Sequence, residues 1–109
     1  MPHYLWQGRY SHAAVKAMVA HPQDREAAAR AGIEAAGGRL HAFYFAFGEA
    51  DVVALIEFPD NVSVAAMGMV LGAAGGLSDA RTTVLLTSAE AQAAMAKAHA
   101  HSGYKAPHA

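Results

Sequence analysis

The segment from Gly38 to Asp60 limits the possible folds of this chain more than any other part. It reads GRLHAFYFAFGEADVVALIEFPD, two runs of alternating apolar residues joined by Gly-Glu-Ala-Asp and closed by Pro-Asp. Alternation with a period of two predicts strands, and the turn residues between the runs predict a β-hairpin. With Glu49 and Ala50 at its tip, Tyr44 is expected to pair with Leu55.

This register gives the hairpin two different faces, because a strand directs successive side chains to opposite sides of a sheet. One face is almost wholly apolar and is expected to pack against helices; it holds His41, Phe43, Phe45, Phe47, Val52, Ala54, Ile56 and Phe58. The other face has an apolar middle and polar ends; it holds Tyr44, Asp51, Val53, Leu55 and Glu57. Because its middle is apolar, we expect the second face to be covered by a partner.

Sequence patterns before and after the hairpin predict the remaining helices and strands, and with them the fold. Helices are expected at residues 12–20 and 22–36, at 61–74 after Asp60 as N-cap, and at 89–98 after Ser88 as N-cap. Strands are expected at residues 3–9 and 80–87. The order is that of a ferredoxin-like βαββαβ fold, an α+β fold with helices on one face of a four-stranded antiparallel sheet. Residues 1–98 are expected to form one domain, and residues 99–109 a mobile tail.

Composition restricts the classes of function. The 109 residues suffice for one domain, and 54% hydrophobic with 16% charged residues favours a globular chain with surface buried in an oligomer. A net charge of −1 gives no reason to expect binding to nucleic acid or to a membrane surface. With no cysteine, thiolate metal sites and a cysteine nucleophile are excluded. The apolar stretch 62–77 is shorter than the roughly 20 residues of a membrane span, so a cytoplasmic protein is expected.

A sheet with helices on one side only leaves its second face open. The simplest partner for such a semi-apolar face is the same face of a second copy, so a homodimer or higher oligomer is expected.

The chain resembles the GYD domain family of small bacterial proteins, which belongs to the dimeric α/β-barrel group. The resemblance covers about residues 4–90 and rests on Gln7-Gly8 with the following Tyr-Ser, Pro22-Gln-Asp-Arg25, Gly37-Gly38-Arg-Leu40, Phe43-Tyr44-Phe-x-Phe-Gly48-Glu49, Asp51-Val-Val, Glu57-x-Pro59-Asp60 and Arg81-Thr82. The family's naming motif has tyrosine before the aspartate of the hairpin turn, whereas this chain has Ala50 there. The resemblance therefore implies a fold and a dimer, but no mechanism.

Polar residues on the open face are the candidate ligand-binding residues. Tyr44 beside Glu57 and Asp51 could supply an acid and a base if burial raised a carboxyl pKa. The neighbouring strands add polar side chains of the same parity, and the full set is Gln7, Arg9, Tyr44, Asp51, Glu57, Arg81 and Thr83. The alternative is that these charges form ion pairs at an interface.

Seven histidines raise the question of a metal site. His99, His101 and His108 lie in the expected tail, where solvation is the simpler interpretation. His41 is expected on the apolar face as a core or edge residue. His3, His12 and His21 have no spacing typical of a metal site. No metal and no cofactor are predicted.

Two functions remain open. The first is a homo-oligomeric domain that binds a small apolar or aromatic ligand or acts as an assembly module. The second is a cofactor-independent enzyme, similar to the monooxygenases or isomerases of the dimeric α/β-barrel group, with its site between the sheet and a partner. An enclosed cavity at Tyr44, Glu57 and Arg81 with a carboxyl of raised pKa would favour the enzyme.

Overall fold

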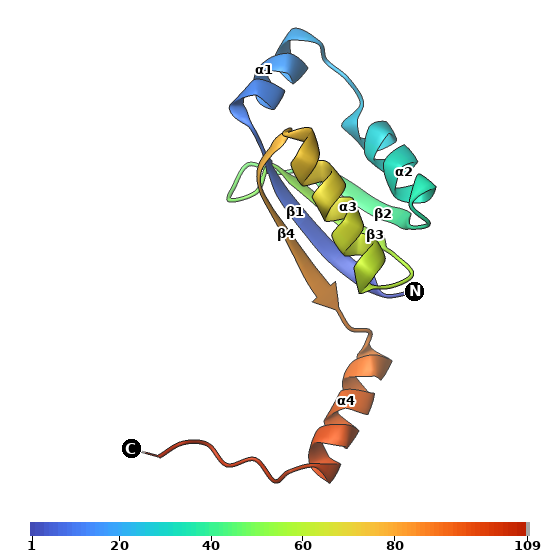
Figure 1. Cartoon of the computed structure of the whole chain (residues 1–109), viewed down its shortest axis with the longest axis vertical. Helices are drawn as coiled ribbons and strands as arrows, with labels where there is room; N and C mark the ends of the chain where they lie inside the picture. The colour runs from blue at the N-terminus through green and yellow to red at the C-terminus, as the bar shows by residue number, and fades with distance from the viewer. Residues whose placement is uncertain (109) are drawn as a thin grey trace.

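The computed structural model describes residues 1–108, which form four strands and four helices (Figure 1). In chain order the elements are β1 (His3–Tyr10), α1 (His12–Ala20), α2 (Arg25–Ala35), β2 (Arg39–Phe45), β3 (Val52–Glu57), α3 (Asn61–Ala74), β4 (Leu77–Leu85) and α4 (Ser88–Ala100). The sheet has the order β2-β3-β1-β4, and all of its neighbouring strands are antiparallel. This confirms the α+β ferredoxin-like prediction.

Local sequence sets the helix boundaries. Ser11, Asp24 and Asp60 accept hydrogen bonds from backbone amides in the first turns of α1, α2 and α3, as N-caps do. Helix α3 ends at Gly75, whose φ of 76° is a left-handed conformation that glycine adopts without strain. Thr87, rather than the expected Ser88, caps α4 in a reciprocal capping box with Glu90.

The core lies between the sheet and the helices, at the end where α2 meets β2. Its fully buried members are Tyr4, Val52 and Phe58, and Ile33, Leu40, Ala54, Ile56 and Val64 are also buried. The Tyr4 hydroxyl donates a hydrogen bond of 2.7 Å to Asn61 Oδ1, which satisfies the polar end of an otherwise apolar side chain. Burial, together with the nearby negative charge of Asp60, raises the pKa of Tyr4. The first strand and the start of α3 are therefore joined by both packing and a hydrogen bond.

The hairpin differs from the prediction at both of its ends. Tyr44 pairs with Val53 rather than with Leu55, and the connection is a loop closed by a hydrogen bond from the Ala46 amide to the Asp51 carbonyl. Phe47 lies in this loop and is fully exposed, so its expected place under the helices is wrong. The longer loop uses residues that strict alternation assigned to strands.

At the other end, an irregularity in β2 changes the side to which His41 points. Leu40 pairs with Ile56 and Ala42 pairs with Leu55, so His41 is an extra residue between two consecutive pairs. A β-bulge of this kind interrupts the alternation of side chains. Leu40 consequently enters the core, whereas His41 turns to the open face and contacts Glu57. The expectation that His41 lies on the apolar face is therefore wrong.

Helix α4 projects away from the rest of the molecule (Figure 1). The structure describes every residue of α4, and none of them is buried. The radius of gyration is 17.7 Å, whereas a compact domain of this length has about 13 Å. Within residues 1–108, no helix combines the length and the apolar character needed to cross a membrane.

Candidate functional site

An apolar hollow lies on the helix side of the sheet. It has a volume of about 370 Å³ and is bounded by the sheet and by α1, α2 and α3. Its walls are almost entirely apolar, with Trp6 and Phe43 from the sheet, Met18 from α1, and Met67 and Leu71 from α3. We call it the helix-side pocket. Four residues with helical spacing, Val64, Met67, Gly68 and Leu71, line the pocket and form the inner side of α3.

Small residues make room for the helix-side pocket. Ala14, Ala17, Ala28 and Gly32 line it from α1 and α2, and Gly68 lines it from α3. A Cβ atom added at Gly32 or Gly68 would meet nothing within 4 Å, so neither glycine is required by close packing. Gln23 and Arg25 contribute polar side chains to its wall, and Tyr10 contributes an aromatic ring with a hydroxyl group. The chemistry of this pocket suits an apolar molecule with one polar group.

The open face holds most of the predicted site residues, in two separate groups. Gln7 on β1 pairs with Arg81 on β4, and Leu5 pairs with Thr83. Tyr44 lies on the β2 edge, with 69% of its surface exposed. Glu57 pairs with His3 at the opposite end of β1 from Arg9. The structure therefore does not bring Tyr44, Glu57 and Arg81 together into one cavity.

Two of the predicted residues have their polar groups occupied by backbone. The Asp51 carboxylate accepts a hydrogen bond of 3.0 Å from the Tyr10 amide, and so fixes the hairpin loop to the end of β1. The Arg9 guanidinium donates a hydrogen bond of 2.6 Å to the Glu49 carbonyl. Arg81 lies 4.0 Å from Asp79 within β4. Within residues 1–108, neither Arg9 nor Arg81 forms an ion pair with Asp51 or Glu57, and ion pairs across an interface stay a prediction.

A smaller, polar hollow of about 200 Å³ lies at this end of the open face. Its walls come from the β1–β4 pair and from the hairpin loop, and they consist of Gln7, Gly8, Arg9, Glu49, Ala50, Asp79 and Arg81. Ala50 occupies the place of the tyrosine in the naming motif of the resembling family. A small side chain at that position leaves part of this hollow empty.

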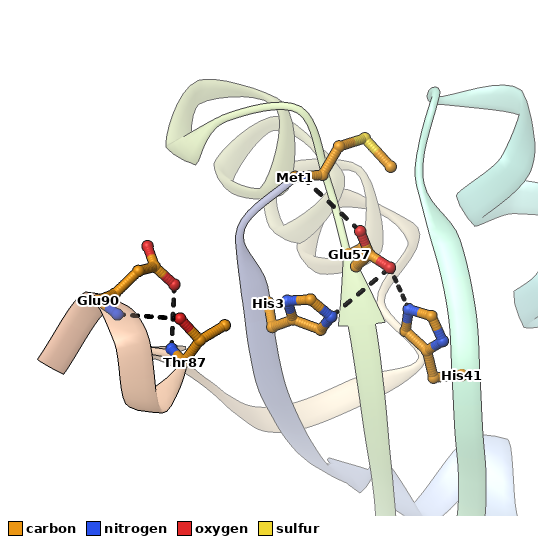
Figure 2. A network of polar contacts seen from close by, with 6 residues as sticks. All are labelled: Met1, His3, His41, Glu57, Thr87 and Glu90. Carbon is orange, nitrogen blue, oxygen red and sulfur yellow. Dashed lines mark hydrogen bonds and ion pairs between the residues drawn. The ribbon is translucent and has the colours of Figure 1, made fainter. Parts of the chain in front are cut away.

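A cluster of titratable groups occupies the other end of the open face (Figure 2). Both His41 Nε2 and His3 Nε2 approach Glu57 Oε1, His41 within hydrogen-bonding distance and His3 at 3.5 Å. The two imidazole rings are stacked, with centroids 5.5 Å apart. The terminal amine of Met1 lies 3.9 Å from Glu57 Oε2. We call His3, His41 and Glu57 the histidine cluster.

The surroundings of Glu57 favour its ionised form. The hydrogen bond from His41 and the nearby positive charges of His3, His41 and the terminal amine lower the pKa of Glu57, although partial burial opposes this. This direction is opposite to the raised pKa that the general-base hypothesis requires. The lowered pKa therefore fits a Glu57 carboxylate that pairs with neighbouring cations, and it does not support the general-base hypothesis.

Sequence reasoning missed the histidine cluster because regular alternation along the hairpin placed His41 on the face opposite to Glu57. One sign was available. Leu40 and Phe43 are both apolar and three residues apart, a spacing that regular alternation cannot place on one face. Recognising a bulge between them would have moved His41 to the side of Glu57. The tail histidines His99, His101 and His108 form no comparable group within the described residues.

A family model described as GYD domain matches residues 4–95. The chain belongs to the GYD domain family. The matched region begins at the second residue of β1 and extends into α4, so it includes the helix-side pocket, all of the sheet except His3, and two of the three residues of the histidine cluster. No curated protein matches this GYD domain.

Proposed function

We propose that this GYD domain binds a small apolar or aromatic molecule in the helix-side pocket and that it works as a homo-oligomer. The observation that supports ligand binding is the size and lining of the pocket. Protein interiors rarely leave voids larger than a water molecule, whereas ligand sites have volumes of roughly 300–1,000 Å³. The volume of about 370 Å³ lies within that range.

The polar groups at the pocket wall suggest what the ligand looks like. Apolar walls supply affinity by removing ligand surface from water, and a few polar groups fix its orientation. Here Gln23 can donate or accept hydrogen bonds, and Arg25 can pair with an anionic group. The side chains of both residues are joined by a hydrogen bond of 2.8 Å, which arranges them before a ligand arrives. A planar apolar molecule with one oxygen or carboxylate group fits this arrangement.

A specific observation favours assembly as the accompanying role. The centre of the open face consists of Leu5, Val53 and Leu55, which cross-strand pairing places side by side. Helix α4 adds a second exposed surface, on which Met95 is 69% exposed. Packing against a second copy would cover the sheet centre and give α4 a contact surface. The alternative of an enzyme on the open face gains no support, because the required groups are apart and the pKa of Glu57 is lowered.

Ligand binding is tested by filling the pocket. The experiment titrates the full chain with the fluorescent probe anilinonaphthalene sulfonate, which is apolar and carries one anionic group. We expect Gly68→Leu to weaken probe binding because its side chain enters the pocket. Gly72→Leu is the matched control: it lies on the same helix, has equally open surroundings and does not line the pocket. Equal probe affinity in wild type and Gly68→Leu would reject the proposal.

Assembly is tested separately by sedimentation at micromolar concentration. We expect the wild type to be a dimer or larger, and Leu55→Lys to shift it toward monomer by placing a charge in the centre of the sheet face. A wild type that stays monomeric would contradict the assembly role and leave the pocket proposal unaffected. Native mass spectrometry of protein from its own host would report the subunit count and any retained ligand together.

A further inference from the structure

We propose that His3, His41 and Glu57 form a binding site for a divalent first-row transition metal ion such as Zn²⁺. The site lies on the open face, on the other side of the sheet from the helix-side pocket. Each residue offers one ligand atom, and the three atoms lie within 4.8 Å of one another. The inference therefore does not depend on ligand binding in the pocket.

The donor set selects the class of metal. Imidazole nitrogen suits zinc, iron, copper and nickel, whereas magnesium and calcium prefer oxygen ligands alone. Two histidines with one carboxylate leave coordination positions open for water or another ligand, as in catalytic rather than structural zinc sites. The histidine cluster is thus suited to a metal ion that remains accessible.

The spacing of the ligand atoms is close to what a metal needs. With metal–ligand bonds of about 2.0–2.2 Å, neighbouring ligand atoms in a tetrahedral site lie about 3.4 Å apart. His3 Nε2 and Glu57 Oε1 are 3.5 Å apart, which is too long for a good hydrogen bond but close to that ligand spacing. Small side-chain rotations would bring His41 to a similar distance. Its ring and that of His3 are each just over one-third exposed, so an ion can enter from solvent.

The direction of the rings separates a shared metal site from simple pairing. Two histidines that only neutralised a carboxylate would be free to use one oxygen each. Instead, both Nε2 atoms converge on Oε1, and Figure 2 shows the two rings directed at the same point. Convergence of three donors on one small volume is the arrangement that a cation requires.

The backbone supports the same site. His3 and Glu57 are direct partners across the β1–β3 ladder, so the register of the sheet fixes their separation. The bulge between Leu40 and Ala42 brings His41 to the same face. Bulges are over-represented beside functional sites, where they redirect a side chain. A rigid sheet thus holds all three ligands.

The test measures metal binding by the full chain with Zn²⁺ in calorimetry and with Co²⁺ in visible absorption spectroscopy. Both titrations are run at about pH 8, because metal ions bind deprotonated ligands and protons compete with them at lower pH. We expect one ion per chain. Loss of an outer-shell partner alone commonly lowers metal affinity about 10- to 100-fold, so loss of a ligand should lower it at least about 100-fold. Glu57→Gln and the double variant His3→Ala/His41→Ala should both show this loss.

A matched control separates this site from the histidines near the C-terminus. The double variant His99→Ala/His101→Ala also removes two imidazoles, and we expect it to bind one ion with unchanged affinity. Urea denaturation without metal verifies that each variant is folded. The proposal is overturned if the wild type binds neither ion, if Glu57→Gln binds as tightly as wild type, or if only the His99→Ala/His101→Ala variant loses binding.

Discussion

The two faces of the sheet have the same strands and opposite chemistry. On the helix side, Tyr4, Val52, Ala54 and Ile56 are buried, and the core they form is continuous with an apolar pocket. On the open side, the residues between them in sequence form a half-exposed surface with an apolar centre, a histidine cluster at one end and an arginine-containing hollow at the other.

The two faces differ in how much they contribute to folding stability and in which polar groups they carry. Burial of apolar side chains on the helix side supplies most of the folding free energy. The open side contributes less to folding and is therefore free to carry groups that are costly to bury, such as Glu57 and Arg81. Substitutions on the helix side should consequently lower the free energy of unfolding strongly, whereas substitutions on the open side should change it little.

The largest effect is expected for a matched pair of aromatic residues. Phe58 is fully buried on the helix side, so Phe58→Ala should lower the free energy of unfolding by about 3–5 kcal/mol. Tyr44 on the open side is mostly exposed, and Tyr44→Ala should change it by no more than about 0.5 kcal/mol. Urea denaturation at low protein concentration measures both. If both variants lost the same free energy of unfolding, the two faces would not differ in their contribution to stability.

The bulge offers a sharper test, because it places adjacent residues on opposite faces. Leu40→Ala should destabilise by about 2–5 kcal/mol, since Leu40 is in the core. His41→Ala should change stability by no more than about 0.5 kcal/mol without metal, since that ring is partly exposed. Unfolding curves of the two variants test the register directly. If His41→Ala lowered the free energy of unfolding more than Leu40→Ala, the bulge would not lie between Leu40 and Ala42.

A smaller effect is expected where a hydrogen bond crosses the core. Tyr4→Phe keeps the ring and removes the hydroxyl that donates to Asn61, so it should lower stability by about 1 kcal/mol. Asn61→Ala removes the other partner and serves as the comparison. The double variant should then cost less than the sum of the two single changes, because both remove the same bond. Strict additivity would indicate that the bond contributes nothing.

The smallest effect is expected for the pH dependence of stability at Asp60, the N-cap residue of α3. Hydrogen bonds from Ser63 lower the pKa of Asp60 below its ordinary value of 3.8. The stabilisation by Asp60 is therefore present above that value and is lost as the pH falls through the lowered pKa of the folded state. Asp60→Asn retains an acceptor for the helix N-terminus but cannot titrate. Its urea midpoint should fall less than that of wild type between about pH 7 and about pH 3; identical slopes would contradict this.

The sequence predicted features that depend on neighbouring residues and missed those that depend on tertiary contacts. Asp60 and the Gly37-Gly38 pair mark helix ends by local chemistry, and the structure places helix ends there. The bulge at His41 lets Leu40 and Phe43 both reach the core; the sequence shows only the spacing of these two residues, and the packing of β2 against the helices decides that both are buried there. Phe47 is wrong in the opposite sense: its apolar side chain predicts burial, but the residue lies in the hairpin loop and is fully exposed.

The candidate site follows the same rule. Parity along the strands placed Gln7 and Arg81 in the same candidate set, and the structure pairs them across β1 and β4, where cross-strand neighbours share a face. The same parity could not predict that Tyr44 and Glu57 lie apart, because the loop length shifts β2 by two residues relative to β3. The helix-side pocket depends on how three helices leave space between them, which no local pattern reports.

The position of Trp6 has a practical consequence for experiments on this domain. It is the chain's single tryptophan, its indole lies over Gly8, and it forms part of the wall of the helix-side pocket. Intrinsic fluorescence excited at the indole therefore comes from one face of the sheet alone. A molecule that enters beneath the helices should change that emission directly, whereas a closed-shell ion such as Zn²⁺ on the opposite face should leave it nearly constant. The protein thus contains a natural optical probe that can distinguish its two surfaces without labelling.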